Sequence, residues 1–360
     1  MAAMSHDRRV VRGLVYGAIA GVNLVNALMV AGGAAIVGRA ALRRVRRIDL
    51  TGAVVLITGG SRGLGLVLAR EFGRHGARVV VCARTEDDLT RARHDLRQRG
   101  VDALAVRCDV TRRDEVDALV RRVVAERGAI DVLVNDAGII DVGPLETMTI
   151  EDFERAMATN FWGAVSTSLA VLPNMRARGA GRIVNIASIG GKVAVPHLAP
   201  YSASKFALVG FSEGLRAELT AHGILVTTVV PGLMRTGSPR NASFKGRHRA
   251  EYAWFAVSDS LPAVSMDVER AARRIVRACR DGDAEVVLSL PAKAAALAHA
   301  LAPGLVADVL GLVNRLLPEP GGIGADRKRG SESESAIAPS WLTALGDAAA
   351  RRHNQLPPAV

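Results

Sequence analysis

The sequence predicts a doubly wound α/β fold, in which a parallel β-sheet of about seven strands carries helices on both faces. Two patterns indicate this fold. Short, largely apolar runs rich in β-branched residues alternate with amphipathic stretches between residues 50 and 292. A glycine-rich turn also follows the first run and opens the next helical stretch. We therefore expect one α/β domain over residues 50–292.

The predicted strands have the composition of strands that are buried on both faces of a parallel sheet. They are Val54–Thr58, Arg78–Cys82, Ala103–Arg107, Ile130–Val134, Arg182–Ala187, Ile224–Val230 and Glu285–Ser289. The stretches between them have helical spacing; Leu64, Leu68 and Phe72, for example, fall on one face of a helix.

The glycine-rich turn has the spacing T-G-x-x-x-G-x-G and predicts a Rossmann-like dinucleotide site. Glycine permits a tight turn and a close approach of the backbone to a pyrophosphate, while the following helix N-terminus offers N–H donors. The alternative, a plain strand–helix turn, would bind nothing. The expected cofactor contacts in this turn are Thr58, Gly59, Ser61, Arg62, Gly63, Leu64 and Gly65.

The residues after the second predicted strand favour NADPH over NADH. An enzyme that uses NAD places a carboxylate there for the ribose 2′-hydroxyl. This chain instead has Ala83 and Arg84, and Arg62 lies in the glycine-rich turn. A guanidinium can bind a 2′-phosphate through two parallel hydrogen bonds. Alternatively, both arginines are solvated surface charges.

A tyrosine and a lysine four residues apart, Tyr201 and Lys205, fall on one face of a predicted helix. A cation held near a phenol favours the phenolate, so we expect Lys205 to lower the pKa of Tyr201. Ser188 lies thirteen residues before Tyr201. A proton donor whose pKa is lowered in this way, beside a dinucleotide site, indicates a hydride-transfer enzyme.

Together these residues resemble the short-chain dehydrogenase/reductase family over roughly residues 50–292. The family's motifs occur in its order: the glycine-rich turn, Asp109-Val110 after the third strand, Asn135 to Gly138 after the fourth, then Asn160, Ser188, Tyr201 with Lys205, and Pro231-Gly232 with Thr236. One position departs from the family pattern, because Asp136 stands where an asparagine is usual. We expect that change to alter a local hydrogen bond near the cofactor, not the catalytic set.

The resemblance implies a role for each matched residue. Tyr201 would be the general acid in reduction, Ser188 would bind the substrate oxygen, and Asn160 would place a water that links Lys205 to solvent. Lys205 would also hold the nicotinamide ribose, and Tyr201 is likewise expected to contact the cofactor. The further cofactor contacts implied are Asp109 and Val110 at the adenine, Asn135, Ala137 and Gly138 along the cofactor, and Pro231, Gly232 and Thr236 at the nicotinamide.

The N-terminal part has a composition unlike that of the predicted domain. Between a short basic flank, residues 1–12, and a basic linker, residues 39–49, lie twenty-six residues without a charge, 13–38. That length predicts a transmembrane anchor, with a signal peptide as the rival. Arginines concentrate after the run, which places the catalytic domain in the cytoplasm. The net charge is +12, and much of the basic excess lies beside this run. These arginines therefore indicate contact with a membrane surface and not nucleic-acid binding.

The C-terminal part contains two segments of different character. Residues 293–317 are apolar with leucines at helical spacing, and Pro303 should interrupt the helix. They either lie at a membrane or over an apolar substrate, or pack on the domain as core. Residues 318–360 are rich in Gly, Ser, Glu and Arg and are expected to be largely disordered, although Trp341 and Leu342 could dock a short helix.

The leading hypothesis is a membrane-anchored, NADPH-dependent reductase of a lipophilic ketone. Residues 238–264, which begin basic and become aromatic, form either a lid over such a substrate or a packed surface helix. Alternatives are a dinucleotide sensor or scaffold without turnover, a membrane tether, and an epimerase or dehydratase. We expect no metal, because the three cysteines lack ligand spacing. A homodimer or homotetramer is expected from the family analogy alone.

Overall fold

The structure, a computed structural model, describes residues 37–356. Two compact units divide the chain, Met1–Arg47 and Ile48–Val360. In the first unit, residues 37–46 are helical. The anchor expected at residues 13–38 lies outside the described residues except for its last two positions. Within residues 37–356, no helix combines the length and apolar character that crossing a membrane requires.

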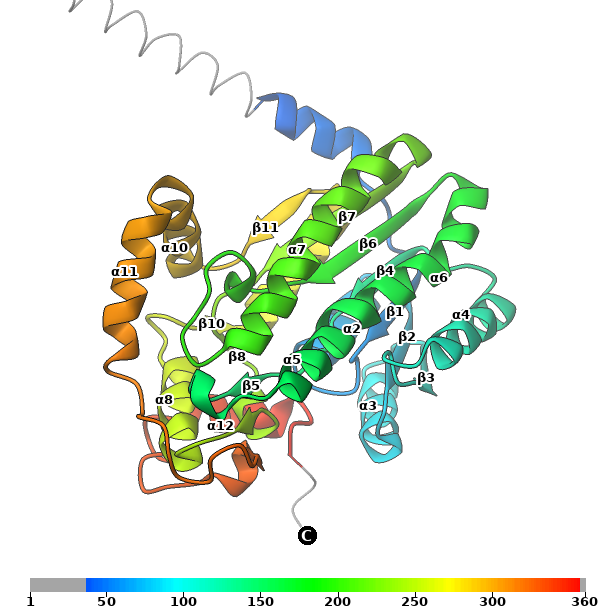
Figure 1. Cartoon of the computed structure of the whole chain (residues 1–360). Coiled ribbons are helices and arrows are strands. Elements are labelled where there is room, and N and C mark those ends of the chain that lie inside the picture. The colour runs from blue at the N-terminus through cyan, green and yellow to red at the C-terminus, as the bar shows by residue number, and fades with distance from the viewer. Residues whose placement is uncertain (1–36, 357–360) are drawn as a thin grey trace, which may run out of the picture. The chain divides into compact units, whose positions relative to one another are not determined.

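The second unit is built on a seven-stranded parallel sheet, as the sequence predicts. The strands are β1 (Val54–Thr58), β2 (Arg78–Ala83), β3 (Ala103–Arg107), β4 (Val132–Asn135), β6 (Gly181–Ile186), β7 (Ile224–Val230) and β11 (Glu285–Val287). They lie in the order β11-β7-β6-β4-β1-β2-β3 (Figure 1). The chain leaves β1 toward one edge and resumes at β4 on the other side. A ligand site is expected at the carboxyl ends of β1 and β4, where the order reverses.

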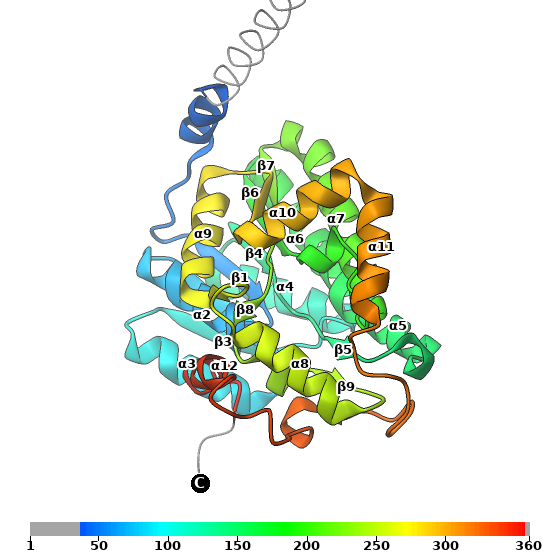
Figure 2. The ribbon, with the colours of Figure 1, turned by 90° about the vertical axis from the view of Figure 1, so that its left-hand side faces the viewer.

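Helices cover both faces of this sheet (Figures 1 and 2). One face packs against α2 (Gly63–Arg74), α3 (Glu86–Gln98) and α9 (Val268–Asp281). The other packs against α4 (Arg113–Arg127), α6 (Gly163–Arg178) and α7 (Ala199–Leu219). Successive strand residues alternate between the two cores, so Val55 and Ile57 join the first and Val54 and Leu56 the second.

A third apolar cluster lies beyond the sheet, around the segment that follows β7. Helix α8 (His248–Ser260) packs there against the two-residue strands β5 (Asp141–Val142) and β9 (Ser243–Phe244). Tyr252 and Phe255 of α8 are buried. Residues 238–264 thus contain a helix packed by its aromatic side chains. This favours a packed surface helix over a lid that covers the substrate. The strands β8 (Met234–Arg235) and β10 (Met266–Asp267) close the segment at its two ends.

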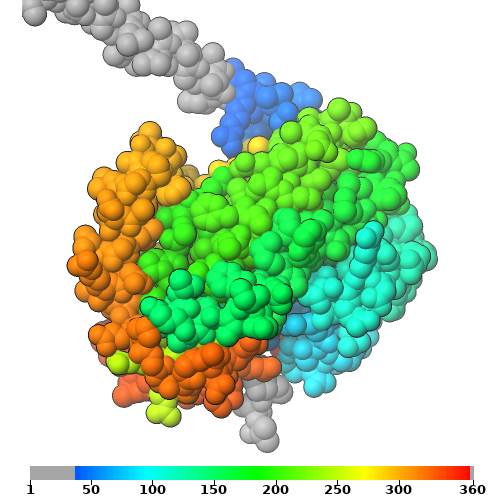
Figure 3. Space-filling model, viewed as in Figure 1, coloured from blue at the N-terminus to red at the C-terminus, as the bar shows by residue number. Residues whose placement is uncertain are grey.

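The apolar C-terminal stretch forms two exposed helices, α10 (Leu290–Leu301) and α11 (Pro303–Asn314). Pro303 begins α11, so the expected break falls at the preceding residue. No residue of α11 is buried, and Leu301 and Leu305 are 78% and 65% exposed. These helices, orange in Figure 3, therefore do not pack on the domain as core.

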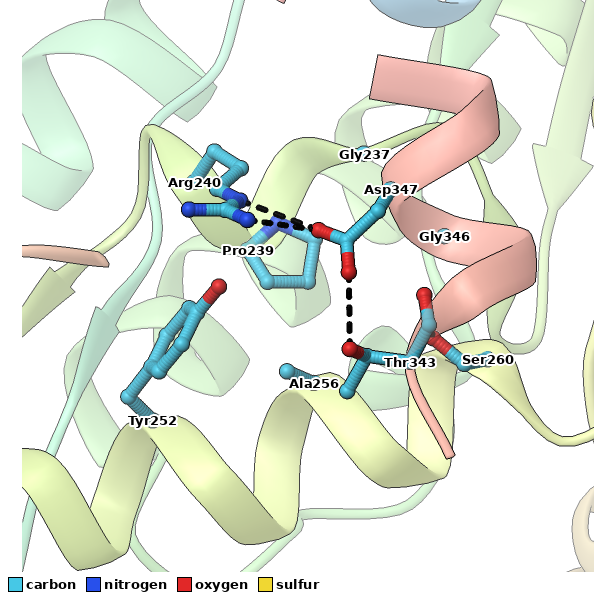
Figure 4. A pocket seen from close by; sticks show the side chains of 9 residues that line it. All are labelled: Gly237, Pro239, Arg240, Tyr252, Ala256, Ser260, Thr343, Gly346 and Asp347. Carbon is cyan, nitrogen blue, oxygen red and sulfur yellow. Dashed lines mark hydrogen bonds and ion pairs between the residues drawn. The ribbon is translucent and has the colours of Figure 1, made fainter. Parts of the chain in front are cut away.

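Residues 318–356 are folded, which corrects the expectation of a largely disordered tail. They contain β12 (Lys328–Arg329), which pairs with β9, and the helix α12 (Ala344–Arg352). Asp347 of α12 forms an ion pair of 2.7 Å with Arg240 and accepts a hydrogen bond from Thr343 (Figure 4). Polar composition indicated disorder, but here the polar side chains find partners elsewhere in the domain.

Candidate active site

The glycine-rich turn joins β1 to α2 at the switch point of the sheet. Gly59 has a φ of +68°, and a Cβ there would lie 2.9 Å from the backbone of Ala137. A Cβ on Gly65 would lie 2.4 Å from the carbonyl oxygen of Gly59. Thr58 Oγ1 accepts the N–H groups of Asp136 and Ala137, each at 3.2 Å. The turn thus packs directly on the segment after β4, and no larger residue fits at these glycines.

Tyr201 and Lys205 lie in the first half of α7, whose start packs beside the loop after β6. Lys205 Nζ lies 5.7 Å from the centre of the Tyr201 ring and donates a hydrogen bond of 2.8 Å to the carbonyl of Ile186. The hydroxyl of Ser188 interacts with the Tyr201 phenol and accepts the N–H of Gly190 at 3.0 Å. The structure therefore brings these three predicted catalytic side chains together.

Asn160 lies in a π-helical turn, Ala158–Trp162, between α5 (Ile150–Met157) and α6. Such turns often occur at functional sites. Its Oδ1 accepts the N–H of Ile139 at 2.8 Å, and its Nδ2 donates to the Ile139 carbonyl and to Ser204 Oγ. A Cβ on Gly138 would lie 3.2 Å from Asn160 Oδ1 and 3.8 Å from Lys205 Nζ. Asn160 and Lys205 therefore flank the same glycine.

Burial, not the lysine, dominates the electrostatics of the tyrosine. Burial raises the pKa of Tyr201 above its ordinary value, the Ser188 hydrogen bond opposes this, and Asp136 raises it further. Burial also lowers the pKa of Lys205 to about 8, although Asp136 opposes that shift. The pKa of Tyr201 is therefore raised, and not lowered as expected, because burial outweighs the contributions that oppose it. The ammonium group of Lys205 faces the Ile186 carbonyl. The carboxyl group of Asp136 raises the pKa of both Tyr201 and Lys205.

Asp136 accordingly bears on the catalytic set and not only on a local hydrogen bond. Its side chain is half-buried and its carboxyl group accepts the N–H of Gly65. Burial raises its pKa to about 8, and the charge of Lys205 opposes this shift. Near neutral pH, Asp136 is then protonated and Lys205 is charged. Above about pH 8, Asp136 is a carboxylate, and its negative charge raises the pKa of Tyr201.

We expect Asp136→Asn to move the alkaline limb of the pH profile for carbonyl reduction to lower pH. The carboxylate raises the pKa of Tyr201, so its removal lets Tyr201 lose its proton earlier. At pH 7 the amide resembles the protonated carboxyl, and kcat/KM should change little. Steady-state rates from pH 6 to pH 10 test this prediction. An unchanged limb, or one moved upward, would contradict it.

The other predicted cofactor residues occupy the carboxyl ends of the strands. Asn135 directs its side chain inward to Asn185, Ser168 and Thr167, and its backbone is paired in the sheet with β1 and β6. Asp109 caps its own turn by accepting hydrogen bonds from Thr111, and Val110 packs at the Gly163 position.

The residues predicted to lie at the nicotinamide follow β7. The Pro231 carbonyl accepts the N–H of Ile189, and Thr236 is buried. Ala137 and Gly138 follow β4 as expected, and Gly232 lies beside Ser289.

A cluster of arginines lies beside the glycine-rich turn. Burial lowers the pKa of Arg62, Asp88 opposes this, and the positive charges of Arg84, Arg329 and Arg91 lower it further. Arg329 comes from the C-terminal segment and was not among the predicted site residues. No sequence signal near the glycine motif points to it. One carboxylate, that of Asp88, forms ion pairs with Arg62 and Arg91, so the four guanidinium groups leave a net positive charge that favours an anion.

The side of Tyr201 away from the sheet is apolar. Its ring packs, with Ile140, Val195 and Trp254, against the third apolar cluster.

His197 and Glu251 join the loop before α7 to α8, with 2.8 Å between His197 Nδ1 and Glu251 Oε1. His197 has a φ of +62°. Sequence reasoning missed this pair, because its two members are far apart in the chain.

Comparison with known proteins shows the family of this chain. The model of the family described as short chain dehydrogenase matches residues 53–245. The chain belongs to the short-chain dehydrogenase family. Its short-chain dehydrogenase relatives include the Anopheles gambiae protein named dehydrogenase/reductase SDR family protein 7-like, which is 37% identical over 71% of this chain and 81% of that protein. The predicted membership of this family is thereby confirmed.

Two solved structures have a similar fold. A variant of actinorhodin polyketide ketoreductase, solved with NADPH, is 36% identical with a TM-score of 0.59, over 66% of this chain and 97% of that one. A gluconate 5-dehydrogenase from Burkholderia cenocepacia, in complex with NADP and tartrate, is 32% identical with a TM-score of 0.60, over 71% and 99%. The family supports an oxidoreductase that uses a nicotinamide dinucleotide.

Proposed function

We propose that this protein is an NADPH-dependent reductase of lipophilic ketones that works through Asn160, Ser188, Tyr201 and Lys205. The observation that carries the proposal is the convergence of these four side chains beside the glycine-rich turn. They come from the π-helical turn, the loop after β6 and helix α7. The ketoreductase activity in the name of a 36% identical relative supports a carbonyl substrate.

Each residue has a distinct part in the proposed mechanism. A nicotinamide dinucleotide, held by the glycine-rich turn and Lys205, would supply a hydride for the carbonyl carbon. Tyr201 donates its phenolic proton to the carbonyl oxygen, and its raised pKa keeps that proton in place at neutral pH. Ser188 donates a hydrogen bond to the same oxygen.

Lys205 and Asn160 complete the set. Lys205 carries the positive charge that stabilises the phenolate once the proton has left. Asn160 fixes the Ile139 carbonyl through its amide, and a water on that carbonyl would return a proton through Lys205.

The arginine cluster supports NADPH as the cofactor. Arg84 directly follows β2, where an NAD enzyme has its carboxylate. Arg62, Arg91 and Arg329 are close enough for their charges to interact. A 2′-phosphate placed among these groups would relieve their mutual repulsion, whereas the 2′-hydroxyl of NADH would not.

Replacing Arg84 with alanine should therefore raise the KM for NADPH and leave the KM for NADH unchanged. One charge-assisted hydrogen bond contributes about 1.5–3 kcal/mol, or roughly a 10–150-fold rise in KM. Arg121→Ala, which removes an exposed arginine on α4, is the matched control. Equal losses with both cofactors would show that Arg84 does not bind the 2′-phosphate.

Apolar surfaces support a substrate from a membrane. The Tyr201 ring borders an apolar cluster, and α10 and α11 expose Leu297, Leu301 and Leu305. In the sequence, residues 13–38 form an uncharged run flanked by arginines. We place the protein at a membrane through that run, with the catalytic domain on the cytoplasmic side.

The full chain in detergent micelles, supplied with NADPH or NADH and a panel of ketones, tests the proposed function. We expect absorbance at 340 nm to fall with NADPH and long-chain or polycyclic ketones. Turnover restricted to small, water-soluble carbonyls would refute the lipophilic substrate. Tight NADPH binding without turnover of any carbonyl would favour a dinucleotide sensor instead.

A further inference from the structure

The C-terminal segment, residues 353–355, lies directly on the glycine-rich turn. The carbonyl of His353 accepts the N–H of Gly63 at 2.8 Å. Asn354 Nδ2 donates to the carbonyl of Ser61 at 2.7 Å and to that of Asp88 at 3.1 Å. Gly63 is the first residue of α2. A backbone carbonyl therefore occupies one of the N–H groups that a helix N-terminus offers to a phosphate.

Gln355 fills the space that the glycine leaves open. A Cβ on Gly63 would lie 2.5 Å from Gln355 Nε2. Asn241 donates to both the backbone carbonyl and the side-chain oxygen of Gln355, at 2.9 and 2.7 Å, and accepts a hydrogen bond of 2.8 Å from Arg62. Glycine in this motif admits a pyrophosphate against the backbone. In this structure the same space holds an amide.

Several contacts hold the segment in place. Arg70 donates to His353 Nδ1 and to the Arg352 carbonyl, at 3.0 and 3.1 Å, and Arg91 donates to Asn354 Oδ1 at 2.6 Å. Burial lowers the pKa of His353 to about 4, and the charges of Arg70 and Arg352 lower it further, so the ring is neutral and can accept the Arg70 hydrogen bond. Upstream, α12 is fastened by Asp347 to Arg240 (Figure 4).

We propose that residues 353–355 are an autoinhibitory strap that competes with the cofactor pyrophosphate for the glycine-rich turn. This inference rests on the dinucleotide site of the proposed function. The His353 carbonyl and the pyrophosphate need the same N–H group, so cofactor binding requires the strap to leave. The observed affinity is then the intrinsic affinity reduced by the fraction of molecules whose strap is open. Arg62 and Arg91, which hold the strap through Asn241 and Asn354, become available to the cofactor when it leaves.

Shortening the full chain at two points tests the strap. A chain ending at residue 352 loses the strap, whereas a chain ending at residue 356 keeps it and is the matched control. We expect the first to bind NADPH at least about tenfold more tightly than the full chain, by calorimetry, with kcat at saturating cofactor unchanged. The control should bind like the full chain. Far-ultraviolet circular dichroism and thermal midpoints verify that both are folded.

A second measurement uses the strap as a free ligand. A synthetic peptide of residues 344–360, added to the chain ending at residue 352, should raise the KM for NADPH competitively, and a scrambled peptide should not. Weaker NADPH binding by the shortened chain would show that the segment builds the cofactor site, which overturns the strap. Equal binding by both chains also overturns it but leaves the proposed function standing. If neither chain binds NADPH or NADH, both proposals are overturned.

Discussion

Replacing Tyr201 with phenylalanine should lower kcat for ketone reduction by about 10²–10⁴-fold, the usual contribution of a general acid. The phenol is the group placed to protonate the carbonyl oxygen, and its raised pKa keeps the proton bound over the neutral range. Phenylalanine keeps the ring that packs against the third apolar cluster. The affinity for NADPH should therefore stay unchanged. Stopped-flow absorbance in a single turnover separates the chemical step from binding.

Two controls make the result specific to proton donation. Ser202→Ala alters a buried hydroxyl of α7 next to Tyr201, whose bond to the Val195 N–H is long at 3.4 Å, and should leave kcat within a fewfold range. The Tyr201→Phe variant should also lose the alkaline limb of the pH profile, since the titrating phenol is gone. If that variant keeps more than a tenth of the kcat, another group protonates the substrate.

The parallel sheet could be predicted because its signal is local. Strands buried on both faces form continuous apolar runs, so β1, β3 and β7 agree with the predicted bounds and the other four differ by a few residues at their ends. The switch point likewise follows from a glycine motif between a strand and a helix. The catalytic residues are within short motifs or at motif spacing, and the structure brings Ser188, Tyr201 and Lys205 together.

What the sequence could not show depends on contacts between distant residues. The effect of Asp136 on Tyr201 requires the burial of both and the arrival of Lys205 from α7. The order of residues 318–356 requires Arg70, Arg91 and Asn241 as partners for a polar segment. Composition indicates the conformational entropy that a polar segment loses when it becomes ordered. It does not indicate the hydrogen-bond partners that offset this loss.

Replacing Lys245 with methionine should lower the free energy of unfolding by about 1–3 kcal/mol, because Asp152 and the Thr147 carbonyl lose a buried donor while Asp152 keeps the ion pairs with Arg327 and Arg155. Lys245 is 1% exposed and directly follows β9. Its ammonium group forms an ion pair with buried Asp152 of α5 and donates to the Thr147 carbonyl at 3.0 Å. Arg327 of the C-terminal part also contacts Asp152, at 3.1 Å. This cluster therefore joins three segments, which are α5, the residue after β9 and the C-terminal part.

The dependence on pH distinguishes a lost ion pair from lost packing. Burial alone would raise the pKa of Asp152, but hydrogen bonds from Lys245 and the Thr149 N–H outweigh it, so the folded pKa is lowered. A lowered carboxyl pKa contributes stability above the unfolded value of about 4, and this contribution is lost as pH falls through the folded pKa. In urea titrations, the gap between Lys245→Met and the unaltered protein should narrow from pH 7 to pH 3. The exposed pair of Arg112 and Asp114 is the control, because Asp114→Asn should cost no more than about 1 kcal/mol. A gap that is equally wide at both pH values would mean that the methylene stem of Lys245, and not its charge, holds the three segments together.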